Sequence, residues 1–312
     1  MAPVTNLPTF GGPRATTLVL TDSGLGGLIV CADLERRLRE TARGGAVKLS
    51  YVNAWPDEGC GYNDLPEMDA RAAVFDRALT AMMTFEPSAV VIACNTLSVV
   101  YRATAFGRAP RVPVEGILDA GVEVFHEALS GDDDGLLALF GTRTTIASGE
   151  HARRLAGLGI DPRRIVAEAC HGLAAAIDRD PDSPDVPGLV DACVLRAAPR
   201  LALAGTLYAG LVCTHYSYVS EIFLSALARH AGERVEVLEP GIRLVDRLMA
   251  AFAAPAAGAG RRDVSVEVVS KVELPESQRK AVAGRLEPLS PATARALIDY
   301  RHVPDLFRGV TS

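Results

Sequence analysis

The sequence predicts an α/β protein made of two pseudo-symmetric, doubly wound lobes, with mainly parallel sheets and a cleft between the lobes. Short apolar runs alternate with helical patterns along most of the chain. Two of these runs, in the first and second halves, end at Cys94 and Cys213. The spacing from Asp22 to Cys94 is 72 positions, and that from Thr142 to Cys213 is 71. This matched spacing indicates an internal repeat whose two strand ends share one cleft.

The composition is that of an ordinary globular protein and argues against several function classes. A formal net charge of -6 gives no basic footprint, so we expect no nucleic-acid partner. No run of 18 apolar residues occurs, so nothing is expected to span a membrane. The 6 cysteines lack CxxC or metal-finger spacing, which predicts free thiols in the cytoplasm and no metal. The few lysines stand away from the predicted strand-end turns, which argues against pyridoxal phosphate.

The first elements place a polar turn beside a helix start. Residues 1–15 contain proline and glycine without a signal-peptide pattern and are expected to be a flexible leader. Residues 16–21 predict a buried strand, and the sequence DSGLGG at 22–27 separates it from an amphipathic helix. The glycines let the backbone approach a ligand closely, and the helix start offers N–H groups to an anion. Asp22 and Ser23 are therefore candidate site residues, although Asp22 has a simpler interpretation as a helix N-cap.

The next elements lead to the first strand-end cysteine. They are a strand at 47–52, a polar turn at 53–66 that carries Tyr62 and Asn63, a helix at 67–85, and a strand at 89–93. The last strand is apolar throughout and ends at Cys94-Asn95-Thr96. In open α/β sheets, ligands bind beyond the carboxyl ends of the strands, which is where these three side chains are expected.

The second half repeats this order of elements. The expected elements are a helix at 120–129, a strand at 136–140, a small-residue turn at 141–145, a helix at 148–158, a strand at 165–169, a helix at 189–198 and a strand at 206–212. The strand at 165–169 ends at Cys170-His171, and the strand at 206–212 ends at Cys213-Thr214-His215-Tyr216. The sequence therefore brings a second thiol to a strand end.

The remaining chain predicts strands at 235–239 and 264–268, a helix at 242–254, a flexible loop at 255–260, a helix at 276–286, and a final helix begun by Ser290. We expect residues 16–117 with 217–269 to form the first lobe and 118–216 the second. Residues 270–312 are expected to be a C-terminal helical extension. This tail is a candidate oligomer contact or cleft cover, and a homodimer is one expected assembly.

Two opposed thiols can invert a carbon acid without a cofactor. A thiolate removes the Cα proton on one face, and a thiol returns a proton on the other. The substrate then needs an α-carboxylate, for which hydroxyl and amide groups are available at Asn95, Thr96, Thr142, Thr145 and Thr214. Asp22 is the best candidate partner for an ammonium group.

Four ordered motifs resemble those of glutamate racemases, in the aspartate/glutamate racemase superfamily. They are DSGLGG at 22–27, ACNT at 93–96, GTxxTxxSG at 141–149 and CTHY at 213–216. The resemblance covers about residues 16–269. It implies two α/β lobes, no cofactor, and Cys94 and Cys213 as the two acid/base residues. It also implies that Asp22 assists Cys94, that His215 assists Cys213, and that the substrate groups are bound by Ser23, Asn95, Thr96 and Thr214.

Four departures from this family leave the substrate side chain open. Gly61-Tyr62-Asn63 stands where Pro-Tyr-Gly is usual, and Asp178 stands where a glutamate follows the cysteine at 170 by eight residues. Ser217 replaces the usual proline, and the tail is long. Glutamate is the default substrate, and another amino acid or a related carboxylic acid is the alternative. Tyr62 and Asn63 are candidate substrate contacts, and Asp178 is a candidate catalytic residue.

Other interpretations of the same residues stay open at this stage. Cys94 or Cys213 could be a nucleophile, or either could join His215 as a zinc ligand in a hydrolase. A binding protein that has lost catalysis is a third alternative. His215 could be a core histidine and Tyr62 a solvated loop aromatic. Four further residues are expected to be structural: His126, His171, Cys31 and Cys193.

Overall fold

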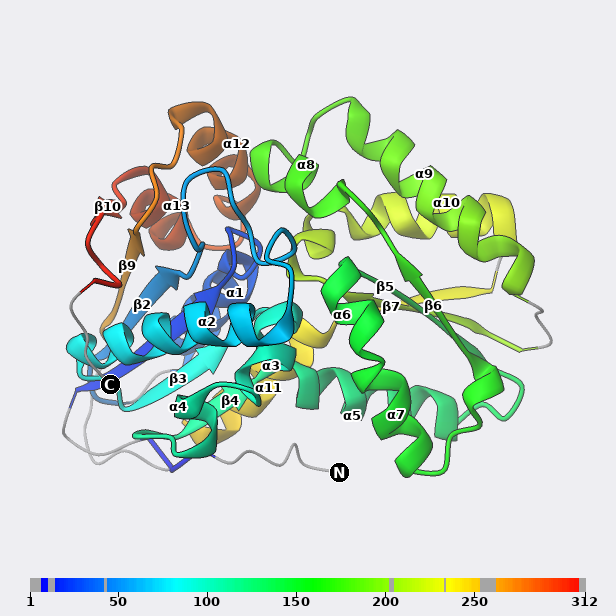
Figure 1. The fold of residues 1–312 in the computed structure, drawn as a ribbon, viewed down its shortest axis with the longest axis horizontal. Helices are drawn as coiled ribbons and strands as arrows, with labels where there is room; N and C mark the ends of the chain where they lie inside the picture. The colour runs from blue at the N-terminus through cyan, green and yellow to red at the C-terminus, as the bar shows by residue number, and fades with distance from the viewer. Residues whose placement is uncertain are drawn as a thin grey trace.

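The structure is a computed structural model that describes residues 7–10, 15–41, 44–201, 205–232, 234–252 and 262–308. Two parallel sheets stand beside each other, each covered by helices on both faces (Figure 1). The larger has strand order β10-β9-β2-β1-β3-β4 and the smaller β6-β5-β7-β8. The predicted α/β class with two lobes is therefore confirmed.

Alternating side chains of β1 explain why the first sheet has helices on both faces. The six-stranded sheet consists of β1 (Thr16–Asp22), β2 (Val47–Asn53), β3 (Ala89–Ile92), β4 (Val114–Gly116), β9 (Val264–Ser270) and β10 (Arg301–His302). Leu18 and Leu20 belong to a core cluster with α1 (Leu28–Glu40), and Val19 belongs to a separate cluster with α2 (Met68–Met82). Successive strand residues point to opposite faces, so an all-apolar strand requires cover on both.

The four-stranded sheet follows the same rule. It consists of β5 (Leu136–Gly141), β6 (Ile165–Ala169), β7 (Leu207–Val212) and β8 (Val235–Leu238). The helices α9 (Asp185–Ala197) and α10 (Ser220–Ala231) lie on one side of it, and α5 (Ile117–Ser130) and α7 (Glu150–Gly157) lie on the other (Figure 1). The shorter helical segments are α3 (Asn95–Tyr101), α4 (Ala105–Arg108), α6 (Arg143–Ser148), α8 (Leu173–Arg179), η1 (Met83–Phe85), η2 (Pro162–Arg164), η3 (Ala198–Arg200) and η4 (Thr214–Val219).

Strand β8 corrects one part of the expected domain division. Residues 217–269 were expected in the first lobe, but β8 pairs with β7 in the smaller sheet, from Leu207↔Val235 to Gly210↔Leu238. A parallel strand pairs readily with its predecessor after one crossover helix, here α10. The chain returns to the first sheet through α11 (Pro240–Ala251), which packs against both α1 and α5.

The C-terminal extension contains the two expected helices and one unexpected strand. The helices are α12 (Glu276–Leu286) and α13 (Pro291–Ile298), and the Ser290 hydroxyl caps α13 by accepting from Thr293 N. After α13, Arg301 and His302 form β10 beside the last residues of β9. Two residues are too short a run for sequence periodicity to detect.

Part of the expected flexible leader is packed. Leu7 and Phe10 are buried, and the Phe10 ring lies 5.1 Å from the Phe252 ring, centre to centre. These apolar side chains cover the end of α11, where Phe10 N also donates to Ala251 O. The rest of the leader and the expected loop at 255–260 lie mostly or wholly outside the described residues.

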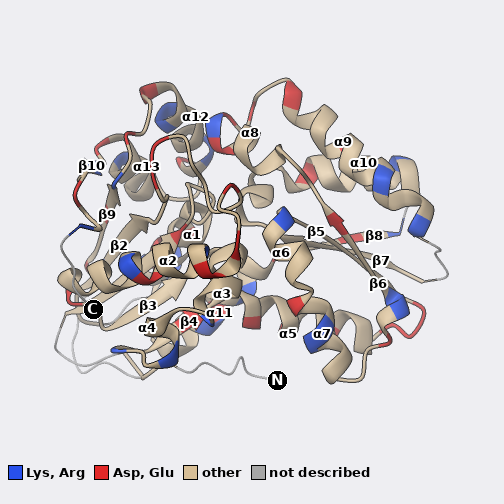
Figure 2. Cartoon of the chain, viewed as in Figure 1, with Lys and Arg blue, Asp and Glu red and all other residues tan. Residues whose placement is uncertain are grey.

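Two other features bear on the expected functions. No helix within the described ranges is long and apolar enough to cross a membrane. In the view of Figure 2, basic and acidic residues are interspersed along the helices rather than separated into fields of one charge.

Candidate active site

A pocket of about 190 Å³ lies at the carboxyl ends of both sheets. All the candidate site residues except Thr145 line it. The lining residues are Asp22, Ser23, Trp55, Gly61, Tyr62, Asn63, Asp64, Cys94, Asn95, Thr96, Thr142, Arg143, Cys170, His171, Gly172, Ala174, Ala175, Asp178, Cys213, Thr214 and His215. Cys94 and Cys213, which follow β3 and β7, therefore line the same pocket.

Cys94 follows β3 and occupies the N-cap position of α3. Its side chain is buried with 6% of its surface exposed, and its sulfur lies 3.3 Å from Ser23 Oγ. Burial, and then the negative charge of Asp22, raise the pKa of the Cys94 thiol well above its usual value. This shift favours the protonated form of the Cys94 thiol.

Asp22 is a buried carboxylate at the junction of the two lobes. Thr214 Oγ1 donates to Asp22 Oδ2 at 2.6 Å, and Ser23 Oγ lies 3.4 Å from Oδ1. The helix α1 has Gly27 as its N-cap and no side-chain cap bond. The interpretation of Asp22 as an N-cap is therefore wrong.

Gly26 shows why the turn after β1 needs glycine. A Cβ at this position would lie 2.6 Å from His215 Nδ1 and 2.7 Å from Thr214 Oγ1. Such distances are closer than real Cβ contacts allow, so only glycine lets this turn approach the residues that follow β7. The second half of the DSGLGG sequence thus permits close contact between the lobes.

Cys213 follows β7 and has a different set of neighbours. Its sulfur lies 3.7 Å from His215 Nδ1, and His215 Nε2 lies 2.6 Å from Asp178 Oδ1. Burial alone would lower the pKa of His215, but its hydrogen bonds with Asp178 and Cys213 raise that pKa well above the usual value. His215 is therefore part of a polar chain that starts at the thiol and ends at a carboxylate.

Three hydroxyl groups meet across the lobes. Thr96 Oγ1 lies 2.8 Å from Thr142 Oγ1 and 3.0 Å from Thr145 Oγ1, and the last two are 3.1 Å apart. Thr142 also caps α6 by accepting from Thr145 N. The expected turn at 141–145 is therefore the start of a helix, because a threonine cap holds residues 143–148 in helical conformation.

Asn95 and Tyr62 line the pocket and carry unsatisfied polar atoms. Both side-chain amide atoms of Asn95 and the Tyr62 hydroxyl are buried, with no hydrogen-bond partner among the described residues. Buried polar groups are nearly always paired with protein, water or ligand. These atoms are therefore suited to bind a polar molecule in the pocket, and Tyr62 is buried rather than a solvated loop aromatic.

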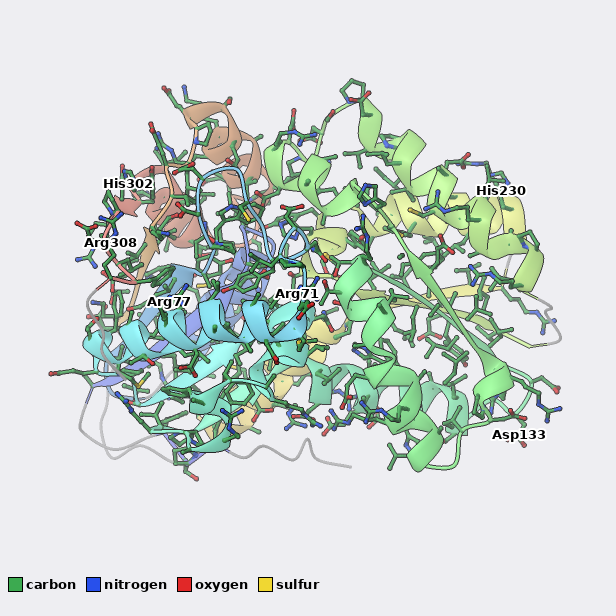
Figure 3. All side chains as sticks on the ribbon, viewed as in Figure 1. Arg71, Arg77, Asp133, His230, His302 and Arg308 are labelled. Carbon is green, nitrogen blue, oxygen red and sulfur yellow. The ribbon has the colours of Figure 1, made fainter. Side chains whose placement is uncertain are left out.

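The loop between β2 and α2 is attached to the other lobe by Asn63. Its Oδ1 accepts from Thr144 Oγ1 at 2.8 Å and from Thr144 N at 3.2 Å. Arg71, labelled in Figure 3 on α2, donates to the backbone oxygens of Tyr62 and Leu65 and so fixes the loop from below. Asn63 therefore links this loop to the start of α6 in the other lobe, and its contact with substrate stays a prediction.

Arg143 and His171 line the pocket but were not expected there. Arg143 Nη2 donates to His171 Nδ1 at 2.9 Å, and Arg143 is the one Lys or Arg side chain among the lining residues. The interpretation of His171 as structural is corrected by this position. A usable signal existed, because Arg143 lies within the GTxxT motif and His171 follows the strand-end Cys170.

The remaining cysteines and histidines lie outside the pocket lining, except Cys170. Cys31 and Cys193 are fully buried on helices, as packing residues would be. Within the described part of the chain, no group of three or more His, Cys, Asp or Glu side chains is arranged to hold a metal ion.

Comparisons with known proteins agree on one family. Residues 30–203 match the family model described as Asp/Glu/Hydantoin racemase. The glutamate racemase of Ruegeria sp. (strain TM1040) is 30% identical over 241 residues, which cover 73% of this chain and 81% of that protein. The glutamate racemase of Pseudomonas putida is 29% identical over 277 residues, with 86% and 92% covered.

Solved structures agree on the fold. Glutamate racemase RacE1 from Bacillus anthracis has a TM-score of 0.66 at 21% identity, covering 88% of this chain and 94% of its own. The enzyme from Francisella tularensis has a TM-score of 0.66 at 16% identity, with 93% and 98% covered. The chain therefore belongs to the Asp/Glu/Hydantoin racemase family and is an isomerase of the racemase type.

Proposed function

We propose that this enzyme inverts the Cα of an amino acid by proton transfer between Cys94 and Cys213, without a cofactor and with glutamate as the default substrate. The observation that carries the proposal is that both strand-end thiols line one pocket, each with its own polar partners. The relatives named glutamate racemase support the default substrate.

The proposed reaction needs a group for each charged part of the substrate. The α-carboxylate binds the Asn95 amide and the threonine hydroxyls, whose donors stabilise the negative charge that develops when the Cα proton leaves. The ammonium group lies near Asp22. One cysteine thiolate takes the Cα proton, and the thiol of the other cysteine gives its proton to the opposite face of the planar carbanion. The number of protons on enzyme and substrate is unchanged by the inversion.

The neighbours of each thiol suit different parts of this cycle. Asp22 raises the pKa of Cys94, so a substrate ammonium that neutralises the Asp22 charge makes the Cys94 thiolate easier to form. On the other side, His215 exchanges a proton with Cys213, and Asp178 stabilises the imidazolium. Ser23 donates to or accepts from Cys94, depending on which group holds the proton.

Arg143 supports a substrate with an anionic side chain. The acidic lining residues are Asp22, Asp64 and Asp178, and Arg143 is the one guanidinium that faces them. Its contact in the pocket is the neutral acceptor nitrogen of His171, so its charge is available to a carboxylate. Glutamate fits this description. The alternative substrate is a different amino acid or a related carboxylic acid.

Single enantiomers incubated with the enzyme in D2O test the proposal. We expect L- and D-glutamate each to gain deuterium at Cα and to reach a racemic mixture, with activity unchanged by a metal chelator. Inversion of another acid but not of glutamate would support the alternative substrate. Absence of inversion with a broad panel of acids would overturn the racemase proposal.

The hydrolase alternatives make different predictions. A cysteine nucleophile predicts that one Cys→Ser change is tolerated, and a zinc enzyme predicts loss of activity with chelator. A cytoplasmic location and a homodimer remain predictions, which cell fractionation and light scattering would check.

A further inference from the structure

Gln278 belongs to the C-terminal extension. Its side chain contacts Asp178, the carboxylate at the end of the polar chain that starts at the Cys213 thiol. Gln278 lies in the first turn of α12, which packs against α8, α13 and α1. Figure 1 shows α12 beside α8, the helix that carries Asp178. Gln278 Nε2 donates to Asp178 Oδ2 at 2.7 Å. The C-terminal extension, more than 250 residues after β1, thus contacts Asp178, a side chain that lines the pocket.

With this hydrogen bond, both oxygens of the Asp178 carboxylate have hydrogen-bond partners. The other oxygen, Oδ1, accepts from Leu25 N at 2.8 Å and lies 2.6 Å from His215 Nε2. The donors come from three separate segments, and together they engage both oxygens. A carboxylate bonded on one oxygen can rotate about its Cβ–Cγ bond, whereas one bonded on both oxygens is fixed in orientation.

The orientation of Asp178 determines how His215 meets the thiol. A proton on His215 Nε2 directed at Asp178 leaves Nδ1 facing Cys213 Sγ, 3.7 Å away. A carboxylate in this position fixes both the tautomer and the ring plane of a histidine.

The helix α12 is fixed in place by packing against the core and by an ion pair. Val282 and Leu286 are buried in the main core cluster, and Arg285 Nε donates to Asp182 Oδ2 at 3.2 Å. Gln278 and Arg285 therefore attach α12 to α8 and to the loop that follows α8. The Gln278 amide is presented from a packed helix rather than from a free tail.

We propose that Gln278 is a positioning residue for proton transfer at Cys213: it fixes the Asp178 carboxylate, which in turn aligns the His215 imidazole. This inference rests on the proposed two-thiol function. Gln278 does not contact the reacting atoms and acts only through Asp178.

Kinetics of Gln278→Ala and Gln278→Glu test the proposal. We expect kcat to fall about tenfold in Gln278→Ala with KM nearly unchanged, since one hydrogen bond to a charged group is lost. Gln278→Glu keeps the length but replaces a donor with an acceptor facing a carboxylate, so its loss should be larger. Ser277→Ala, at an exposed site in the same turn, is the matched control and should leave kcat unchanged.

A double-mutant cycle separates positioning from a general loss of structure. If Gln278 acts through Asp178, Gln278→Ala should cost little more in an Asp178→Asn background. The primary isotope effect with Cα-deuterated substrate should also rise for one enantiomer and fall for the other, because only the Cys213 step is slowed. Additive losses with symmetric isotope effects would overturn the inference.

An activity-independent measurement distinguishes failure of this inference from failure of the proposed function. The ring-nitrogen NMR signals of His215, assigned by their loss in His215→Asn, should shift in Gln278→Ala and stay in place in Ser277→Ala. If the enzyme racemises nothing, the proposed function fails while these signals still test the positioning role. Unchanged His215 signals would overturn the positioning role even in an active racemase.

Discussion

Thr214 Oγ1 donates a 2.6 Å hydrogen bond to Asp22 Oδ2, which joins the residue that ends β1 to the residue that follows Cys213. Asp22 ends a strand of the six-stranded sheet, and Thr214 begins η4, which follows β7 of the four-stranded sheet. Asp22 lies close enough to Cys94 for its charge to raise the pKa of that thiol. The carboxylate therefore connects the surroundings of the two proposed acid/base groups.

Serine at Cys94 or at Cys213 should abolish inversion. We expect Cys94→Ser and Cys213→Ser each to lower kcat by a factor on the order of 10³ or more, because an alkoxide is much harder to form than a thiolate and one acid/base group is lost. Circular dichroism of single glutamate enantiomers measures the rate. Cys60→Ser, outside the pocket, is the matched control. Near-normal inversion by either pocket variant would contradict the two-thiol mechanism.

Removing the charge of Arg143 should weaken the preference for an acidic side chain. We expect Arg143→Gln to raise KM for glutamate about tenfold and to change kcat less, since its proposed partner is the side-chain carboxylate of the substrate and not the Cα–H bond. The ratio of kcat/KM for glutamate to that for glutamine should fall. Arg111→Gln, an exposed site outside the pocket, serves as control. An unchanged ratio in Arg143→Gln would show that another group binds the side chain.

The His215–Asp178 pair should make stability depend on pH. Because the pKa of folded His215 is raised above 6.5, the contribution of the pair is fully present below about pH 6.5 and is lost as the pH rises through the raised value. The difference in unfolding free energy between wild type and His215→Asn should therefore decline with pH, by at most about 1.4 kcal/mol per pH unit.

Urea unfolding at several pH values from 6 to 10 measures this difference. His302→Asn, at an exposed histidine, should show no comparable decline. A difference that is constant across this range would mean that pairing with Asp178 does not raise the pKa of His215.

Loss of the Asn63 contact should loosen the loop over the pocket. Asn63→Ala removes the acceptor of two Thr144 donors, so we expect KM to rise several-fold with a smaller change in kcat. Steady-state kinetics measure both constants. Glu67→Gln, an exposed site at the end of the same loop, should behave like wild type. A fall in kcat alone would indicate a role in chemistry instead of closure.

The main elements of the fold could be predicted because the local patterns and the tertiary structure agree. All four residues of β3 are buried, so the prediction of a buried strand from its continuous apolar sequence is confirmed. Ser290 caps α13 as its sequence position suggests. The prediction that β8 belongs to the first lobe is wrong. Contacts between residues far apart in the sequence decide which strands pair, and the alternation of side chains within one strand does not encode them.

The site could be predicted where motifs end strands, and less well where tertiary contacts decide. Cys94 and Cys213 reach the pocket because parallel strands carry their carboxyl ends to one edge. Arg143 begins α6 and His171 follows β6, and only the folded chain brings Arg143 Nη2 within 2.9 Å of His171 Nδ1. Gln278 lies 100 positions from its partner Asp178, a contact that no local pattern can reveal.

The unlike surroundings of Cys94 and Cys213 have a consequence for successive catalytic cycles. In a two-base racemase, each turnover leaves the two thiols with exchanged protonation states, so the product-free enzyme is ready for the opposite enantiomer. Under the proposed mechanism, burial and the negative charge of Asp22 disfavour the empty state in which Cys94 is the thiolate. The equilibrium constant of one requires equal kcat/KM in both directions, but maximal rates need not match. At high substrate concentration, proton redistribution in the empty pocket should therefore limit one direction more than the other.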